Sequence, residues 1–297
     1  MKILNIGSMN IDKVYNMEHI VSPKETADSL GYNEFCGGKG LNQSCAAAKA
    51  GAQVFHAGMI GQDGQMLKDM LISSGVDTSL IREIDAPTGH AVIQVDKAGQ
   101  NSIIIFGGAN RLLTNAYVEE VLSQFAAGDI LLLQNEVSCN ARSIELAHEK
   151  GMTVALNPSP YDKALEECDF SKVDLFILNE VEGAQMAGIT SADPAVLRSA
   201  LQEKYPNAGF VLTLGSEGSC YFKGDEFVKQ PIFSVKAVDT TAAGDTFCGY
   251  FLAGLAEGLS KEQCMRRAAA ASALAVSKKG AAPSIPVREE TEAFLEK

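Results

Sequence analysis

ILLLQNEVSCNARSIELAHEKGMTVALN, residues 130–157, has the pattern of a strand, a helix and a second strand in succession. The runs at 130–133 and 153–156 are continuously apolar, and the segment from Ala141 to Lys150 between them has helical periodicity. A third apolar run at 175–178 continues the alternation. Strands without polar alternation are buried on both faces. The sequence therefore predicts an α/β fold, with a doubly wound, mostly parallel sheet and helices on both of its faces.

Two segments interrupt this alternation, residues about 13–36 and 89–106. In the second, the strand-like runs 90–95 and 101–105 flank a turn at 96–100, which is typical of antiparallel strands. We expect a small β-sheet that acts as a lid on the parallel core; a plain hairpin at the sheet edge is the alternative. No low-complexity tract, Pro-rich linker or internal repeat divides the chain, so we expect a single domain over residues 1–297 with this lid inserted.

The composition is that of a folded globular protein, with 46% hydrophobic and 21% charged residues among 297. A net charge of -12 argues against a broad phosphate-binding surface, so we expect no nucleic-acid partner. The seven cysteines contain no C-x-x-C pair and the four histidines no H-E-x-x-H, which argues against a zinc site. We expect the thiols to be reduced and packed as small apolar side chains.

The first residues, 1–7, form a strand pattern that ends in Gly7, without the long apolar stretch and cleavage site of a signal peptide. No apolar run is long enough to span a bilayer. We therefore expect a cytoplasmic protein without a membrane partner. Because this strand leads to Gly7-Ser8-Met9-Asn10 and not to G-x-G-x-x-G, the sequence also argues against a Rossmann dehydrogenase.

A candidate anion site lies where a strand-like segment meets a helical pattern expected from Gly244 to Gly258. Ala243, Gly244 and Asp245 would present unpaired backbone N–H groups there, and the helix dipole favours a phosphate or a developing negative charge. Asp245 is a candidate catalytic base, and a plain helix cap is the alternative. A second helix is expected over 261–279, in which the run 268–271 of four alanines allows close packing.

A second candidate binding segment is the Gly-rich stretch 36–44, which precedes an Ala-rich helix expected from Cys45 to Ala50. It is not a Walker A loop, because Lys39 is followed by Gly40 and not by Ser or Thr. The glycines would bring the backbone and the side chain of Lys39 or Asn42 close to a polyhydroxylated ligand. A tight turn with a solvated lysine is the alternative.

Gly37-Gly38-Lys39-Gly40-Leu41-Asn42 and Asp239-Thr240-Thr241-Ala242-Ala243-Gly244-Asp245 together resemble the two signature motifs of the ribokinase (PfkB-type) carbohydrate kinase family. The similarity also covers residues 7–12 and the tail 275–284, so it spans nearly the whole chain. It implies a ribokinase-like α/β fold with a β lid that closes over a sugar and commonly forms a dimer contact. The partners that the resemblance implies are a sugar, ATP and a second copy of the chain.

The resemblance also implies which residues contact the sugar, and these are Asn10, Asp12, Gly38, Lys39, Gly40, Asn42, Glu136 and Asp245. Carboxylates and amides suit this task, because each pairs two adjacent hydroxyls and rejects analogues that leave its polar atoms unsatisfied. By the same resemblance, Asp245 accepts the proton of the primary hydroxyl, and the amides of Ala243 and Gly244 stabilise charge on the transferring phosphoryl group. The alternative for Asp12 and Glu136 is that they are solvated loop carboxylates.

On the nucleotide side the resemblance implies contacts from Asn179, Glu182, Thr213, Gly215, Ser216, Gly218 and Gly244. Asn179 would face the phosphates and Glu182 would order a hydrated Mg²⁺. A helix-capping pattern is the alternative for Asn179 and Glu182. A tight turn that needs the same glycines is the alternative for 213–218.

The tail resembles a K⁺ loop whose ligands would be Asp239, Thr241, Ala275, Lys278, Gly280 and Ser284. Lys278 would contribute only its carbonyl, because an ammonium group has no acceptor for a cation. An ordinary helix end at Gly280 is the alternative.

The predicted function is ATP-dependent phosphorylation of a sugar's primary hydroxyl, with D-ribose as the first substrate and D-ribose 5-phosphate as the product. Another pentose, deoxyribose, a nucleoside or fructose is the alternative acceptor, and a non-catalytic sugar-binding regulator is the alternative from another class. Two positions depart from the family. Arg111 follows 107–110 at a position where a small residue is usual; it is either a surface arginine or a group that holds an anionic acceptor. The run 268–271 contains neither the Asn nor the His that relatives often have beside adenine.

Overall fold

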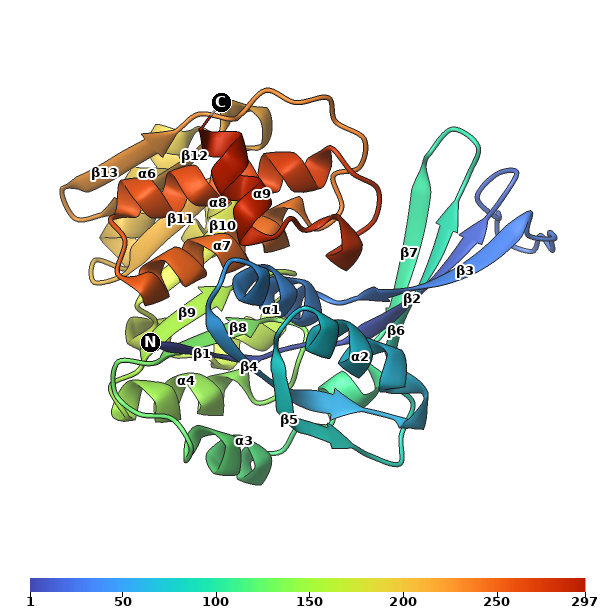
Figure 1. Ribbon diagram of the computed structural model, residues 1–297, viewed down its shortest axis with the longest axis horizontal. Helices are drawn as coiled ribbons and strands as arrows, with labels where there is room; N and C mark the ends of the chain where they lie inside the picture. The colour runs from blue at the N-terminus through green and yellow to red at the C-terminus, as the bar shows by residue number, and fades with distance from the viewer. Residues whose placement is uncertain (297) are drawn as a thin grey trace.

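The computed structural model describes residues 1–296 and contains two β-sheets, the larger of them flanked by helices (Figure 1). The larger sheet has nine strands in the order β13-β12-β11-β10-β9-β8-β1-β4-β5, and all neighbours are parallel except in the pairs that β12 makes. The strands are β1 Lys2–Ile6, β4 Gln53–Ile60, β5 Asp77–Glu83, β8 Ile130–Gln134, β9 Thr153–Asn157, β10 Leu175–Asn179, β11 Gly209–Thr213, β12 Ser219–Lys223 and β13 Glu226–Gln230. The prediction of a doubly wound, mostly parallel sheet is confirmed.

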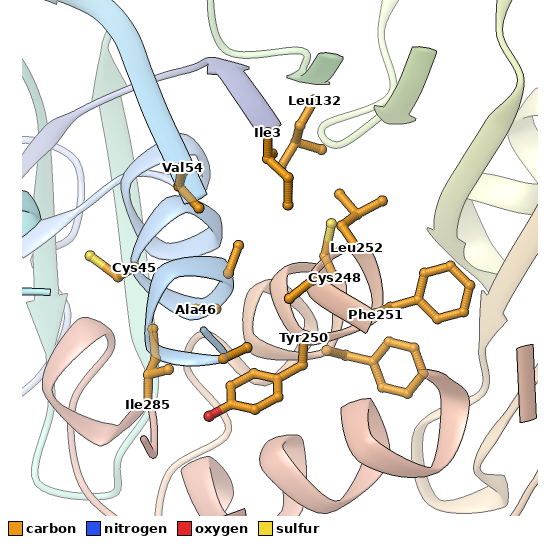
Figure 2. Packing of buried hydrophobic residues seen from close by; sticks show 14 of the residues in the cluster. Ile3, Cys45, Ala46, Val54, Leu132, Cys248, Tyr250, Phe251, Leu252 and Ile285 are labelled. Carbon is orange, nitrogen blue, oxygen red and sulfur yellow. The ribbon is translucent and has the colours of Figure 1, made fainter. Parts of the chain in front are cut away.

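Helices cover both faces of this sheet because successive side chains of its strands point to opposite sides. Ile3 and Leu132 pack on one face with α1, α7 and α8, whereas Leu4 and Leu131 pack on the other with α3 and α4. Figure 2 shows the first cluster, in which Tyr250 and the residues near it on α7 meet α1. The helices are α1 Lys39–Lys49, α2 Gln65–Ser73, α3 Asn115–Leu122, α4 Asn140–Glu149, α5 Glu180–Ala187, α6 Pro194–Lys204, α7 Ala243–Glu257, α8 Lys261–Val276 and α9 Arg288–Leu295.

The smaller sheet has four strands in the order β3-β2-β6-β7 and projects from the side of the main body (Figure 1). Its strands are β2 Asn10–Asn16, β3 Gly31–Gly37, β6 Gly89–Val95 and β7 Asn101–Phe106. The two interrupting segments thus meet in one sheet, each as an antiparallel pair, and β2 joins β6 in parallel. The pair β2–β3 begins at Asn10 rather than near residue 13, so Asn10 and Asp12, which were both predicted to contact the sugar, belong to this sheet.

Helix α1 begins at Lys39, so the expected helix start at Cys45 is wrong. Gly38, with φ 93°, turns the chain into the helix, and Gly40 lies in its first turn. A Cβ on Gly40 would lie 2.6 Å from the Cα of Gly7, so only glycine lets α1 approach the end of β1 this closely. Two thirds of the Gly-rich segment 36–44 is therefore helical, and this helical part carries Asn42, Gln43 and Ser44 into the interior.

Helix α8 ends at Val276 with Ser277 as its C-cap, three residues before the expected Lys279, and Gly280 adopts a φ of 94° in the loop beyond. Ala268, Ala270 and Ala271 are fully buried, as expected for a run that packs closely. No helix in the described part of the chain is both long enough and apolar enough to span a membrane.

Candidate active site

A pocket lies at the carboxyl ends of β9, β10 and β11, where they meet the first turn of α7. In a parallel sheet this edge is the usual place for a ligand, because loops and helix N-termini converge there. The residues that line it are Lys39, Asn157, Ser159, Ile177, Leu178, Asn179, Glu182, Thr213, Thr240, Ala242, Ala243, Gly244 and Asp245. Seven predicted site residues from four segments of the chain are thereby brought together.

Asp245 lies buried in the first turn of α7, and its carboxylate does not cap the helix. Asn42 Nδ2 donates to its Oδ2 at 3.0 Å, and Gln43 Nε2 donates to its Oδ1 at 2.9 Å. The N-cap is instead Ala242, in the left-handed region with φ 59° and without a side-chain cap. A non-glycine residue in this region costs about 1 kcal/mol. The helix-cap alternative for Asp245 is therefore wrong, and the carboxylate is held for another purpose.

The backbone amides at this helix start are only partly as predicted. The N–H of Ala243 is not free, since it donates to the carbonyl of Thr240 at 3.2 Å and closes the turn before α7. Within residues 1–296, the N–H groups of Gly244 and Asp245 have no acceptor. A Cβ added to Gly244 would have no atom within 4 Å. The anion site therefore rests on the amides of Gly244 and Asp245, and not on that of Ala243.

The two predicted sugar-side carboxylates lie close enough to interact. Glu136 follows β8, and its Oε2 accepts hydrogen bonds from the hydroxyl of Ser8 and from Lys39 N, the latter at 3.1 Å. The carboxylate of Asp12, on β2, receives no hydrogen bond from residues 1–296 and lies against Gly37, where a Cβ would overlap it. Burial, and secondarily the charge of Glu136, raise the pKa of Asp12 to about 7. A half-buried carboxylate without a donor is suited to a ligand that brings hydroxyl groups.

Asn10 is buried at the crossing from β1 to the small sheet, and Asn110 holds it there. Asn110 Nδ2 donates to Asn10 Oδ1 at 2.8 Å and to the carbonyl of Met9 at 3.1 Å, while its Oδ1 accepts from Met9 N at 3.0 Å. Asn110 was not among the predicted site residues, although its segment 107–110 resembles a stretch that lines the sugar pocket. It fixes the amide of Asn10 in orientation.

Lys39 connects the two sides of the site. Its side chain lines the pocket, and its backbone N–H binds Glu136. Burial opposes the charged form, but the carboxylates of Asp245, Glu136 and Glu182 together raise the pKa of this ammonium above its ordinary value. A lysine that stays charged inside a pocket is suited to an anionic group. This position favours a ligand role for Lys39 over the solvated-lysine alternative, and that role stays a prediction.

Asn179 and Glu182 form a reciprocal capping box at the start of α5, which was the alternative to a ligand role. Asn179 Oδ1 accepts from Glu182 N at 2.8 Å, and Glu182 Oε2 accepts from Asn179 N at 3.1 Å. Both side chains nevertheless line the pocket, where the amide of Asn179 keeps its two N–H donors. The cap therefore orients the pair, and the ligand role stays a prediction.

The segment after β11 forms the tight turn that was the alternative explanation of its glycines. Leu214 N donates to the carbonyl of Gly218 at 2.9 Å, and Gly215 and Gly218 have positive φ values of 52° and 95°. Of the four residues predicted here, Thr213 lines the pocket, whereas Gly215, Ser216 and Gly218 lie in the turn beyond it. Nucleotide contacts from the three turn residues stay a prediction.

Asp239 joins the two segments predicted to surround a cation. Its Oδ1 accepts from Thr241 N at 2.9 Å, and its Oδ2 accepts from Gly280 N at 3.0 Å. Burial raises the pKa of Asp239, but these hydrogen bonds outweigh burial and hold it below its ordinary value. Lys278 directs its ammonium to Glu290 at 3.1 Å, so only its main chain faces this loop.

The donors at this loop are oxygens, which fit a monovalent cation and not zinc. No three His, Cys, Asp or Glu side chains lie together as metal ligands in residues 1–296, so a cation here would rest mainly on main-chain oxygens. Ala275 and Ser284 flank the loop, with Ser284 buried and its hydroxyl bonded to the carbonyl of Ala281. The cation stays a prediction.

Arg111 is exposed and supports the loop that carries Glu136. Its guanidinium donates to the carbonyl of Val137 at 3.3 Å and to that of Asn135 at 3.5 Å.

Three residues at the pocket were not predicted as site residues. Asn157 and Ser159 line the pocket, and Gln43 lies behind it and binds Asn157. A signal for Asn157 was present, because it ends an apolar strand at the edge where parallel-sheet sites lie.

Comparison with known proteins identifies similar chains over almost the full length. The family model described as pfkB family carbohydrate kinase matches residues 1–288. A ribokinase of Haemophilus influenzae is 37% identical, over 98% of this chain and 97% of its own. A deoxyribokinase of Salmonella typhi is 32% identical, over 99% of both chains. The structure of Arabidopsis thaliana ribokinase complexed with ribose and ATP has a TM-score of 0.90 and 32% identity, and the match covers 99% of this chain and 98% of that one.

Proposed function

The chain belongs to the pfkB family of carbohydrate kinases, and on this premise we propose that it transfers the γ-phosphoryl group of ATP to the primary hydroxyl of D-ribose, giving D-ribose 5-phosphate and ADP. The observation that carries the proposal is the position of Asp245. Its carboxylate, held by two amides, lies beside two unpaired N–H groups at the start of α7. A proton acceptor next to an anion site is what transfer of a phosphoryl group to an alcohol requires.

In the proposed reaction, Asp245 accepts the proton of the ribose 5-hydroxyl as that oxygen bonds to the γ-phosphorus. The bond from this phosphorus to the β,γ-bridging oxygen breaks, and ADP leaves with the electron pair. The unpaired amides of Gly244 and Asp245 and the ammonium of Lys39, which lines the same pocket, would stabilise the charge on the transferring group. Asn10, Asp12, Asn42 and Glu136 would hold the sugar hydroxyls.

The proposal includes two cations. Mg²⁺ bound with ATP would neutralise charge on the β- and γ-phosphates, and Glu182, buried in the pocket beside Asn179, would order its water shell. K⁺ would lie between the loop of Asp239 and Thr241 and the segment 275–284, next to the anion site. We also propose a cytoplasmic location and a single domain in which the small sheet acts as the lid.

The proposal is tested by measuring ADP release from the purified protein with Mg²⁺ and ATP, using ribose, deoxyribose, fructose and a few nucleosides, with and without K⁺. Turnover on ribose that K⁺ stimulates is the expected result. Turnover confined to a different acceptor would replace the substrate, and ribose binding without any turnover would favour the non-catalytic sugar-binding alternative.

Deoxyribose is the second candidate acceptor, because a deoxyribokinase is 32% identical over 99% of this chain. The 2-hydroxyl distinguishes the two sugars. A carboxylate such as Asp12, without a donor from the protein, would pair adjacent hydroxyls of ribose and lose one of them in deoxyribose. We therefore expect kcat/KM to favour ribose by about 10²-fold or more, as is usual when a buried polar group loses its partner.

We expect ribose to bind more tightly as the pH rises from 6 to 8. The pKa of Asp12 is about 7 in the free protein, so the carboxylate is mostly protonated at pH 6 and mostly ionised at pH 8. The ionised form accepts hydrogen bonds from hydroxyls on both oxygens. The dissociation constant for ribose, measured by calorimetry without nucleotide, is expected to fall about tenfold over this range.

Asp12→Asn is the control, since an amide does not titrate here. Its ribose affinity should be weaker and independent of pH, because the titrating carboxyl group is gone and burial raises the pKa of the neighbouring Cys36 thiol further above this range. A parent affinity that is constant, or that weakens as the pH rises, would contradict the assignment.

A homodimer through the small sheet is part of the proposal. Ile103, Ile104 and Ile105 on the edge strand β7 are 52%, 64% and 58% exposed, and Tyr32 and Phe35 on the opposite edge strand are also exposed. Apolar side chains on open sheet edges favour burial against another chain. A second copy of this chain is the occupant that the family resemblance implies.

Ile104→Glu is expected to convert the dimer to monomers, as measured by sedimentation, because it places a charge among these apolar side chains. Val196→Glu is the matched control, since it introduces the same charge at a 47% exposed position near the start of α6, far from the small sheet in sequence. A parent protein that sediments as a monomer, or a variant that stays dimeric, would contradict the proposed interface.

A further inference from the structure

Gln43 lies immediately behind the base of the site, on the first helix. It is 1% exposed, and its Nε2 donates to Asp245 Oδ1 at 2.9 Å and to Asn157 Oδ1 at 3.1 Å. Its Oε1 accepts from Gln134 Nε2 at 2.7 Å. One side chain therefore joins α1, α7 and the ends of β8 and β9.

We propose that Gln43 is a positioning residue that holds the carboxylate of Asp245 in the orientation needed to accept the proton. This inference rests on the proposed kinase function and goes beyond the signature motifs, which assign no role to Gln43.

The direction of the Gln43 amide is fixed by groups further from the site. Asn5 Nδ2 donates to the backbone carbonyl of Gly40 at 2.8 Å, and this carbonyl can only accept. Asn5 Oδ1 must then accept, and it does so from Gln134 Nε2 at 3.1 Å. The same nitrogen of Gln134 donates to Gln43 Oε1, so the Nε2 of Gln43 has to point to Asp245. If the Gln43 amide were flipped, its Nε2 would face the donor Gln134 Nε2 and its Oε1 would face the acceptor Asp245 Oδ1, so both hydrogen bonds would be lost.

This chain restrains Asp245 against rotation. Asn42 binds one carboxylate oxygen and Gln43 binds the other, and both donors come from consecutive residues of the same helix. Rotation of the carboxylate would misalign both bonds. Asn42 is a predicted sugar contact that a ligand would engage, whereas Gln43 is absent from the pocket lining and has no other task there. Gln43 is thus the donor that stays with Asp245 through the reaction.

Gln43→Met tests the inference, because it keeps the approximate length and volume of the side chain and removes its N–H donors. We expect kcat with ribose to fall by about 10²-fold, the loss that follows when a reacting group is misplaced by an ångström. The dissociation constant for ribose should change less than about twofold, since Gln43 does not line the site. Gln65→Met, an exposed glutamine at the start of α2, is the matched control and should retain the parent kcat.

An unchanged kcat in Gln43→Met would overturn the inference. So would equal losses of kcat and ribose affinity, because they would indicate a general distortion of the site. Failure of the parent enzyme to turn over ribose would instead refute the proposed function, and the two failures are therefore distinguishable.

Gln43→Glu gives a second readout if the methionine variant does not fold, since it has the same shape and keeps an oxygen for Gln134. It places a second carboxyl group beside Asp245, and two carboxyls at this distance share one proton. We expect the ratio of variant to parent kcat to be lowest at acid pH, where the pair is protonated, and to rise with pH. A ratio that is constant with pH would show that position 43 does not act through Asp245.

Discussion

Replacing Asp245 with asparagine is expected to lower kcat for ribose phosphorylation by about 10³-fold, within the range that a general base contributes. An amide of the same shape cannot accept the proton of the attacking hydroxyl. It also places an NH₂ group against the donor of Asn42 or Gln43, so a loss of about 1–3 kcal/mol in folding stability should accompany the change. Steady-state kinetics, thermal unfolding and ribose calorimetry on the variant measure the three effects separately.

Asp193→Asn is the matched control for this substitution. Asp193 caps α6 by accepting from Ala195 N at 2.9 Å and from Val196 N at 3.1 Å, and asparagine caps helices equally well. This variant should keep both activity and stability. Retention of more than about a tenth of the parent kcat in Asp245→Asn would be too small an effect for a general base and would refute the assignment of Asp245.

Gly244→Ala is expected to lower kcat by about 10²-fold, the usual effect of disturbing one preorganised donor to the transition state. The methyl group would project into space that no protein atom occupies within 4 Å, beside the unpaired amides. Because residue 244 is helical and the space is open, the folded state should tolerate the change or gain about 0.5–1 kcal/mol. The measurement is kcat together with the midpoint of thermal unfolding.

Gly249→Ala in the same helix provides the opposite case. A Cβ there would lie 2.7 Å from the backbone nitrogen of Ala47 on α1, so the variant should lose about 1–3 kcal/mol of stability through overpacking. If Gly244→Ala instead lost stability and kept its kcat, position 244 would have a structural role and the anion site would be misplaced.

The main sheet was predictable because its strands are buried on both faces and therefore have continuously apolar sequences. Asp245 was predictable as a site residue because a helix N-terminus after a strand is visible locally. The cap alternative for Asp245 was excluded only by the structure, in which its carboxylate accepts hydrogen bonds from side chains of α1, about 200 residues earlier in the chain; the role of base stays a prediction.

The start of α1 was not predictable, since residues 39–44 are mostly polar or glycine and lack helical periodicity. Asn42, Gln43 and Ser44 are buried because their partners lie on other strands and helices far away in sequence. No local pattern contains such partners. The engaged amide of Ala243 was missed for a related reason, because its acceptor depends on the left-handed turn at Ala242, which alanine rarely makes.

Strands β2 and β3 of the small sheet lie between β1 and α1 in the chain and join the main body there through residues 7–9 and Gly38. Asp12 lies on the far side of these two crossings, and Asp245 lies on the near side. A sugar that touches both carboxylates would therefore link the small sheet to helix α7 of the main body. Substitutions that loosen the connection at residues 7–9 or at Gly38 should weaken sugar affinity while leaving the melting temperature of the main body unchanged. Sugar affinity therefore reports how rigidly the small sheet is attached to the main body.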